Sequence, residues 1–401
     1  MNILFLSIYE INDSNSGYIY ADLIREFSKH NHNIYAVTPT RTGETTHFID
    51  DNGVTIVKIK NGQIQKTGKI KKVINLLTLE NKTIKALKKY VKGVKFDLII
   101  SMASSLSYAK TSCYFKKRCK AINYLLVKDI FPQNAVDIGM LKTKGIMGFV
   151  YRHFCKKEKK LYSNADFIGC MSQANADYIL AHHPEINNKK VTVVPNSIEP
   201  QDVSLTKEER LAMRKKYDIP LDKVVFVYGG NLGKPQGIPF IIDCLRSQKD
   251  NQNVFFFIVG DGTEYNKLDQ AFTNNQQENV KLLKRLPRED FDSMLAACDA
   301  GMIFLDGRFT IPNYPSRLLS YMQAGLPVFA CTDTNTDVGK DIVQGNFGWW
   351  CENGNLTDFV DIIQTIDVND CKNKGNLSRH YLLEYFSVCG CYETIMEAAP
   401  I

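Results

Sequence analysis

A glycine-rich segment in the second half of the chain is the clearest candidate for binding chemistry. It reads Tyr228-Gly-Gly-Asn-Leu-Gly-Lys-Pro-Gln-Gly237, between a predicted strand at Val224 to Tyr228 and a predicted helix at Gly237 to Arg246. Glycines let the backbone approach a ligand closely, and N–H groups at the start of a helix favour an anion. Lys234 adds a positive charge suited to phosphate. The segment predicts a phosphate-binding loop, although it lacks the Gly-Lys-Ser/Thr ending of a Walker loop. A flexible connection without a ligand is the alternative.

A second segment, Pro312 to Pro327, combines a helix start with charged and hydroxyl side chains. We expect its helix to run from Pro315 to Ala324, because proline is favoured at the first helical position. Ser316 and Arg317 would then lie in the first turn, where Arg317 could hold a diphosphate. Ser320, one turn further along, could reach a sugar hydroxyl. The alternative for Arg317 is an ordinary arginine on the surface.

A carboxylate follows a third predicted strand, Ile122 to Val127. Asp129 comes two residues after this strand, at the end where ligands of parallel sheets bind. A carboxylate placed there can act as a general base toward an attacking hydroxyl group. The alternative is structural, with Asp129 capping the following turn or pairing with Lys128.

Strands and helices alternate in both halves of the chain, which predicts an α/β fold with two doubly wound, Rossmann-like sheets. The polar segment Pro195 to Glu209 is the expected linker. We therefore predict an N-terminal domain at 1–197, a C-terminal domain at 198–375, and a C-terminal helix at 376–401 that could pack back on the N-terminal domain. In such sheets, ligands bind beyond the carboxyl ends of the strands, so the two domains are expected to face a cleft.

The composition is that of a globular protein, with 44% hydrophobic and 23% charged residues among 401. The longest apolar runs, such as Val254 to Val259, fall well short of the roughly 18 residues needed to span a bilayer. The N-terminus lacks the basic region of a signal peptide, and the eleven cysteines show no zinc or redox spacing. These features favour reduced thiols in the cytoplasm. The pair His182 and His183 lacks carboxylates at ligand spacing, and we expect no metal site.

Positive charge is concentrated in one part of the chain. Residues 51–160 hold 25 Lys and Arg against 6 Asp and Glu, whereas residues 201–401 hold 20 against 27. Lysines alternate with apolar residues over Lys66 to Lys95 and Lys142 to Lys160, a pattern typical of a helix attracted to anionic lipid. We expect peripheral association with the inner face of the cell membrane. A solvated helix face is the alternative, and we expect no nucleic-acid partner because no nucleic-acid-binding motif is present.

Five segments occur in the order of a known family: ADFIGCMSQANADYI, VTVVPNSIEP, GGNLGKPQGI, IVGDGTEYNKL and YPSRLLSYMQAGLPV. With them the chain resembles a family 4 nucleotide-sugar glycosyltransferase of the GT-B fold. The N-terminal segments DLIREFSKHNHNIYAVTPT and VKDIFPQNAVDIG resemble the subgroup that makes capsule and O-antigen repeat units. Within that subgroup, N-acetyl-fucosamine transferases are the most similar.

The resemblance implies transfer of a sugar from a UDP-sugar to a polyprenyl-diphosphate-linked saccharide, with no metal or other cofactor. Asp129, Arg317 and Lys234 are then the expected catalytic residues, with the acceptor near Gly17 and Asp129. The donor is expected at Gly17, Gly230, Asn231, Lys234, Arg285, Leu286, Ser316, Arg317, Leu318 and Ser320, with the base near Arg285, Leu286 and Pro287.

The sequence departs from the family at four positions. Pro312 and Ser320 stand where many members have a pair of glutamates, and Asn231 and Gln236 stand where many have Arg and Lys. Two other functions therefore stay open: a nucleotide-sugar 2-epimerase of the same fold, and an inactive nucleotide-binding scaffold protein. The retained glycine loop and Arg317 favour the transferase over the scaffold, because a scaffold needs no phosphate site.

Overall fold

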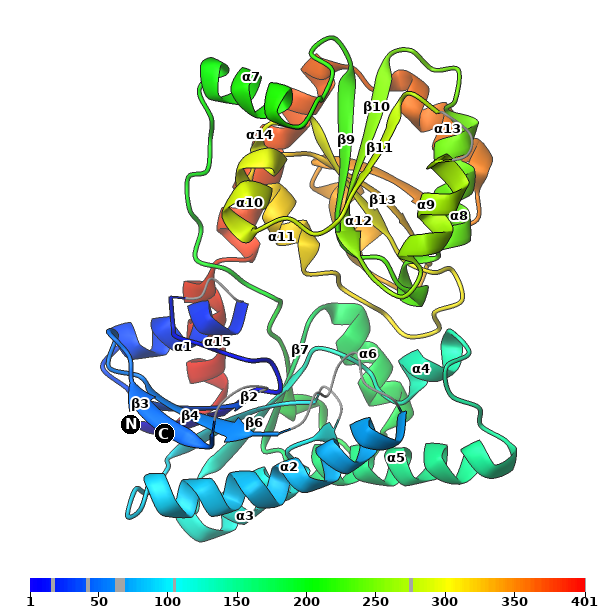
Figure 1. Ribbon diagram of the computed structural model, residues 1–401. Coiled ribbons are helices and arrows are strands. Elements are labelled where there is room, and N and C mark those ends of the chain that lie inside the picture. Colours follow the sequence, from blue (N-terminus) through cyan, green and yellow to red (C-terminus); the bar gives the residue numbers. More distant parts are fainter. Residues whose placement is uncertain (16–18, 41–43, 62–68, 104–105, 274–276, 401) are drawn as a thin grey trace. The chain divides into compact units, whose positions relative to one another are not determined.

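Two β-sheets form the framework of the chain (Figure 1). The computed structural model describes residues 1–15, 19–40, 44–61, 69–103, 106–273 and 277–400. One compact unit comprises Met1–Glu199 with Ser387–Ile401, and the other comprises Pro200–Phe386. We refer to them as the N-terminal unit and the C-terminal unit. Each contains one of the two sheets, which confirms the predicted doubly wound α/β architecture.

The N-terminal sheet has the strand order β3-β4-β2-β1-β5-β6-β7-β8, and every strand pair except β3–β4 is parallel. The strands are β1 (Asn2–Leu6), β2 (Asn33–Thr40), β3 (Thr46–Ile49), β4 (Thr55–Lys60), β5 (Leu98–Met102), β6 (Ile122–Val127), β7 (Phe167–Cys170) and β8 (Val191–Val193). The antiparallel edge strand β3 was not predicted from the sequence.

Helices cover both faces of this sheet because alternate strand residues point to opposite sides. Ile3 and Phe5 pack in one core cluster with residues of α1 and α15, and Leu4 and Leu6 pack in another with residues of α2 and α3 (Figure 1). The helices of this unit are α1 (Ile19–Lys29), α2 (Lys69–Tyr90), α3 (Ala109–Cys119), α4 (Gln133–Asp137), α5 (Gly145–Asn164), α6 (Gln173–His182) and α15 (Val388–Ala398).

The C-terminal sheet is parallel throughout, in the order β11-β10-β9-β12-β13-β14. Its strands are β9 (Val224–Asn231), β10 (Val254–Asp261), β11 (Val280–Leu283), β12 (Ala300–Phe304), β13 (Val328–Thr332) and β14 (Gly348–Glu352). Its helices are α7 (Lys207–Lys216), α8 (Ile238–Ser247), α9 (Tyr265–Thr273), α10 (Arg288–Ala296), α11 (Arg317–Gln323), α12 (Val338–Gln344), α13 (Leu356–Thr365) and α14 (Val368–Tyr385).

The helix predicted from Pro315 to Ala324 begins later than expected. It is α11, which starts at Arg317, with Ser316 as its N-cap residue. The preceding residues are held by tertiary contacts: the Tyr314 hydroxyl donates to Asp341 Oδ2 at 2.6 Å, and the Thr336 hydroxyl donates to the Asn313 carbonyl. These contacts fix the segment that precedes α11.

Two further expectations about helices were wrong. The predicted linker contains the start of α7, which a capping box between Thr206 and Glu209 initiates. The Thr-x-x-Glu pattern was the sequence signal for it. The single helix expected from residue 376 onward is two helices, α14 and α15, which belong to different units. Ser387 separates them and caps α15 by accepting a hydrogen bond from the backbone N–H of Gly390.

Among the described residues, no helix is long and apolar enough to cross a membrane.

Candidate active site

The carboxyl end of β9 carries the first part of the glycine-rich loop. The Gly229 backbone N–H donates to the Tyr321 hydroxyl at 3.0 Å, and that hydroxyl donates to the Met302 carbonyl of β12 at 3.0 Å. Tyr321 on α11 therefore ties the ends of β9 and β12 together. Gly230 follows with φ of +123°, a conformation that other residues rarely adopt, and it is exposed. The strand thus ends in an open stretch of backbone.

Arg317 lies against this stretch. Its guanidinium carbon is 4.4 Å from the ring centroid of Tyr228, and a Cβ built on Gly230 would lie 3.6 Å from the guanidinium. The Nη1 atom of Arg317 is buried and has no hydrogen-bond partner. An arginine is always charged at physiological pH, and a buried donor left unmatched is costly. This arrangement provides a fixed positive charge with one donor available to an anion.

The rest of the loop is held by Gln236. The Gln236 Oε1 atom accepts hydrogen bonds from Asn231 Nδ2 and from the Gly233 backbone N–H, both at 3.0 Å. Gln236 therefore fixes the shape of the loop. Lys234 is exposed, and among the described residues no carboxylate forms an ion pair with it. Gly237, with φ of +63°, precedes the first turn of α8.

The Gly-Asp-Gly sequence at the end of β10 supports the loop by close packing. A Cβ built on Gly260 would lie 2.1 Å from the Gly230 carbonyl oxygen, and one on Gly262 would lie 2.2 Å from the Leu232 carbonyl oxygen. Only glycine permits this approach of two backbones. These two glycines therefore shape the loop after β9.

The segment between β12 and α11 forms another side of the site. Asn335 Nδ2 donates to the Phe309 carbonyl at 2.7 Å, and the Thr336 hydroxyl donates to the Asn313 carbonyl. The loop after β13 thus fastens the segment before α11. The Asn313 Nδ2 atom is buried and has no partner. Pro312 is buried in the same segment.

Asp333 positions the loop after β13. It is 2% exposed, its Oδ1 atom accepts from the backbone N–H groups of Asn335 and Thr336 at 2.9 and 3.2 Å, and its Oδ2 atom has no partner. Burial raises the pKa of Asp333 to about 6. Sequence reasoning missed Asp333, and the Asp-x-Asn-Thr pattern after a predicted strand was the signal for such a turn.

The remaining predicted donor residues occupy different environments. Arg285 is exposed and Leu286 half-buried in the connection that follows β11, and Ser316 is exposed with no capping hydrogen bond from its side chain. Leu318 is fully buried, and its backbone N–H donates to the Pro315 carbonyl. Ser320 is half-buried on α11.

Asp129 belongs to the N-terminal unit. It follows β6 and lies near Tyr20, whose pKa is raised well above its usual value by burial and then by Tyr9 and Asp129. The neighbouring Lys128 binds backbone carbonyl groups. Lys128 Nζ donates to the carbonyls of Val194 and Pro195 at 2.8 and 3.1 Å, and burial lowers its pKa to about 8. Lys128 thus joins the end of β6 to the chain after β8. Gly17 lies outside the described residues.

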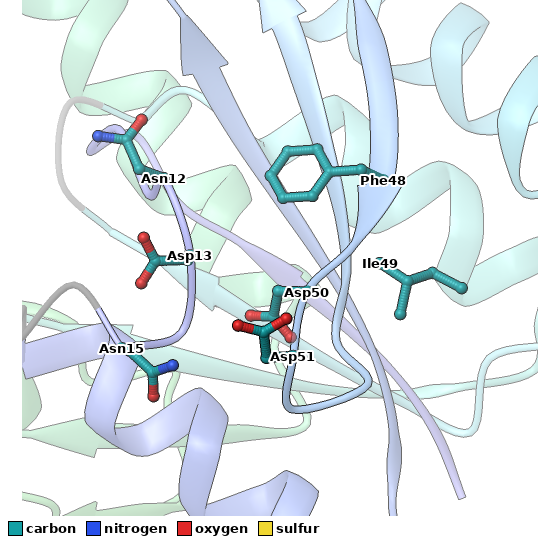
Figure 2. A pocket seen from close by; sticks show the side chains of 7 residues that line it. All are labelled: Asn12, Asp13, Asn15, Phe48, Ile49, Asp50 and Asp51. Atoms are coloured by element: carbon teal, nitrogen blue, oxygen red, sulfur yellow. The ribbon is translucent and has the colours of Figure 1, made fainter.

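The N-terminal unit has a hollow between the chain after β1 and the β3–β4 turn (Figure 2). Its lining residues are Asn12, Asp13, Asn15, Phe48, Ile49, Asp50 and Asp51. The Asp50 carboxylate accepts hydrogen bonds from the backbone N–H groups of Ser14, Asn52 and Val54. Its role in this turn is therefore structural. In the part of the chain that the structure describes, no group of three His, Cys, Asp or Glu side chains could hold a metal ion.

Solved structures with the same arrangement define the fold as GT-B. Sucrose-phosphate synthase from Thermosynechococcus elongatus superposes with a TM-score of 0.78 at 12% identity, covering 99% of this chain and 97% of the other. Anabaena Alr3699/HepE in complex with UDP-glucose superposes with a TM-score of 0.68 at 16% identity, covering 99% and 98%.

Residues 209–376 match the family model described as "Glycosyl transferases group 1". The matched residues lie within the C-terminal unit. The probable glycosyltransferase WbjE of Pseudomonas aeruginosa is 26% identical over 66% of this chain and 64% of its own length. The putative colanic acid biosynthesis glycosyl transferase WcaI of Escherichia coli is 22% identical over 61% and 60%. The chain thus matches about three fifths of the length of these curated relatives.

Proposed function

We propose that the protein is a nucleotide-sugar-dependent glycosyltransferase whose C-terminal unit binds the donor. The observation that carries the proposal is the unmatched Nη1 donor of Arg317 beside the exposed backbone of Gly230. A diphosphate at this place would accept from Arg317 and gain the charge of Lys234. The family match of residues 209–376 supports this assignment.

In the proposed reaction, an acceptor hydroxyl attacks the anomeric carbon of the donor sugar. The bond from that carbon to the phosphate oxygen breaks, and the nucleoside diphosphate leaves with the electron pair. Arg317, Lys234 and backbone N–H groups near Gly230 stabilise the negative charge that develops on it. Asp129 of the N-terminal unit takes the proton of the attacking hydroxyl.

The proposed donor is a UDP-sugar with an N-acetyl group, such as UDP-N-acetyl-fucosamine. The UDP part is supported by the likeness in fold to Anabaena HepE in complex with UDP-glucose. The N-acetyl group is supported by Asn313, whose buried Nδ2 has no partner and could donate to an acetamido oxygen. No carboxylate stands at Pro312 or Ser320 to bind sugar hydroxyls.

The proposed acceptor is a polyprenyl-diphosphate-linked saccharide in capsule or O-antigen synthesis. The likeness to WcaI, named for colanic acid biosynthesis, supports a role in polysaccharide assembly. The N-terminal segments that resemble the capsule and O-antigen subgroup support it independently. The product would be a lipid-linked saccharide that is one sugar longer.

A nucleotide-binding scaffold is the second candidate, because Pro312 and Ser320 replace residues that many active relatives carry. A scaffold would bind the nucleotide without consuming a donor. A measurement of sugar transfer distinguishes the scaffold from the proposed enzyme.

The first test is thermal unfolding with UDP, GDP, ADP, TDP and several UDP-N-acetyl sugars. A ligand at a hundredfold excess over its dissociation constant adds about 2.7 kcal/mol to the free energy of unfolding. We expect UDP and one UDP-sugar to raise the melting temperature in the parent protein and in Arg246→Ala, a variant at an exposed arginine of α8. We expect Arg317→Ala to lose most of this response. A protein that responds to none of the nucleotides would contradict the proposal.

A further inference from the structure

The start of α5 exposes an unusual number of large apolar side chains. Ile146 is 86% exposed, Phe149 70% and Met140, in the preceding segment, 56%. Met147 and Val150 are exposed as well. Residues three and four apart lie on one side of a helix, so Ile146, Phe149 and Val150 form a continuous apolar strip. We call Met140, Ile146, Met147, Phe149 and Val150 the α5 apolar patch. Exposed patches of this kind mark interaction sites.

Positive charges surround the α5 apolar patch. Lys142, Lys144 and Arg152 are all exposed, and the Arg152 guanidinium carbon lies 4.5 Å from the ring centroid of Phe149. Residues 138–157 contain no Asp or Glu. The acid that follows, Glu158, is 8% exposed and buried beside Tyr162, so it does not offset these charges at the surface.

The rest of α5 anchors the patch to the fold. Leu161 and Tyr162 at the far end of the helix are buried, and Phe154 packs edge-on against Phe131 with ring centroids 4.9 Å apart. At the near end, a Cβ built on Gly148 would lie 2.6 Å from the Thr143 carbonyl oxygen. The exposed apolar side chains are therefore presented by a helix that is fixed on its other side.

The basic surface continues beyond α5. Helix α3 contacts both α2 and α5. It carries the exposed Lys117 and Lys120 at its C-terminal end, and α5 carries the exposed Lys156 and Lys160. A broad positive surface with apolar side chains at one end fits a flat anionic partner.

We propose that the α5 apolar patch inserts into the surface of an anionic lipid bilayer while the surrounding lysines and Arg152 bind lipid phosphates. Apolar side chains at a membrane interface beside basic residues gain from both burial and charge. A second copy of the chain is a poorer partner, because two such patches would bring like charges together. The bilayer would be the partner that supplies the lipid-linked acceptor. In this respect the inference rests on the proposed function.

The test is flotation of the whole protein with two kinds of vesicle, phosphatidylglycerol mixed with phosphatidylcholine and phosphatidylcholine alone. We expect binding to the anionic vesicles, weakened by salt. We expect the double variant Ile146→Ser, Phe149→Ser to bind at least about tenfold more weakly. The triple variant Lys142→Gln, Lys144→Gln, Arg152→Gln should lose the preference for phosphatidylglycerol. The matched control is Leu211→Ser, Leu221→Ser, which changes two exposed leucines of the C-terminal unit and should bind like the parent.

A second readout uses Phe149→Trp in a chain whose natural tryptophans, Trp349 and Trp350, are replaced by Phe. Its emission should shift to shorter wavelength with anionic vesicles and stay unchanged with phosphatidylcholine alone. Equal binding of the serine double variant and the parent would overturn the inference. So would concentration-dependent dimerisation that the double variant abolishes, since a second copy would then be the partner.

The UDP-induced rise in melting temperature, measured on the same variants, separates this inference from the proposed function. If the parent responds to UDP but binds no vesicle, the docking surface is wrong and the donor site stands. If the parent binds anionic vesicles but responds to no nucleotide, the docking surface stands and the proposed function is wrong.

Discussion

The guanidinium of Arg317 lies over the ring of Tyr228, with 4.4 Å between the guanidinium carbon and the ring centroid. Tyr228 is on β9 and Arg317 is the first residue of α11, so the contact joins elements that are far apart in the sequence. The Tyr228 hydroxyl donates to the Asn231 carbonyl at 2.7 Å, which also fixes the turn that follows Gly230. The same tyrosine thus positions the positive charge and the exposed backbone.

Replacement of Arg317 tests the charge directly. We expect Arg317→Ala to lower kcat by about 10²- to 10³-fold, the usual effect of removing one group that stabilises transition-state charge. Arg317→Lys should recover only part of the activity, because lysine lacks the planar guanidinium that stacks on Tyr228. Steady-state kinetics with the chosen UDP-sugar, together with circular dichroism, make the comparison. Near-normal turnover in a folded Arg317→Ala protein would remove the residue from the mechanism.

Gly230 and Gly354 form a matched pair for testing the exposed backbone. Both have positive φ, +123° and +103°, but a Cβ on Gly354 would contact nothing within 4 Å, whereas one on Gly230 would lie beside Arg317. Each change to alanine should cost roughly 1–3 kcal/mol of stability through backbone strain. Only Gly230→Ala should also weaken UDP binding, by about tenfold or more, which corresponds to ~1.4 kcal/mol. Titration calorimetry measures both affinities, and equal affinities would show that no ligand approaches Gly230.

Asp333 should make stability depend on pH. Its pKa is about 6 in the folded protein and about 3.9 when unfolded, so the folded state binds more protons between these values. The free energy of unfolding should therefore fall as the pH rises from about 4 to 6, by roughly 2–3 kcal/mol from this residue. Asp333→Asn keeps an Oδ1 acceptor for the backbone of the turn but does not titrate. The free energy of unfolding of this variant should therefore lack the fall that Asp333 causes.

Urea unfolding of the parent and Asp333→Asn from pH 4 to 8 checks this prediction. Burial also raises the pKa of Glu158 to about 7, so Glu158 adds a further fall in the free energy of unfolding at higher pH. The difference between the two curves isolates the contribution of Asp333. Asp243→Asn, at an exposed site of α8, controls for the loss of a carboxylate. Parallel curves for the parent and Asp333→Asn would be incompatible with a buried, protonated carboxyl group.

Asp129→Asn tests the proposed base. We expect transfer to fall by about 10²- to 10⁴-fold while UDP affinity stays the same, because Asp129 belongs to the N-terminal unit and the proposed diphosphate site is in the C-terminal unit. Asp177→Asn, at an exposed carboxylate on α6 of the same unit, should keep full transfer. Full transfer by Asp129→Asn would show that this carboxylate is not the base.

The repeating strands and helices were predictable because apolar periodicity depends on local sequence. The C-terminal strands β9, β10, β12 and β13 are almost fully buried and appear in the sequence as continuous apolar runs, which parallel sheets require. The start of α11 at Arg317 was less predictable, because the Tyr314–Asp341 and Thr336–Asn313 hydrogen bonds that hold the preceding segment come from distant parts of the chain.

The candidate site, like the fold, was predictable only in part from the sequence. Spacing and residue type pointed to Gly230 and Arg317, and the structure brings the two together. The roles of Gln236 and Lys128 could not be read from the sequence, because each depends on which backbone atoms the folded chain places within reach. Asn313 and Asp333 each have a buried side-chain atom without a hydrogen-bond partner, which likewise results from three-dimensional packing.

The most direct measurement of the central claim is transfer of label from UDP-N-acetyl sugars to lipid. Purified protein would be incubated with each labelled donor and membranes that contain polyprenyl-diphosphate-linked saccharides. We expect one donor to release UDP and to label a lipid-linked product, with the parent and Arg246→Ala active and Arg317→Ala almost inactive. If no donor is consumed while UDP still raises the melting temperature, the protein binds nucleotide without catalysing transfer, and the account of it as an enzyme is contradicted.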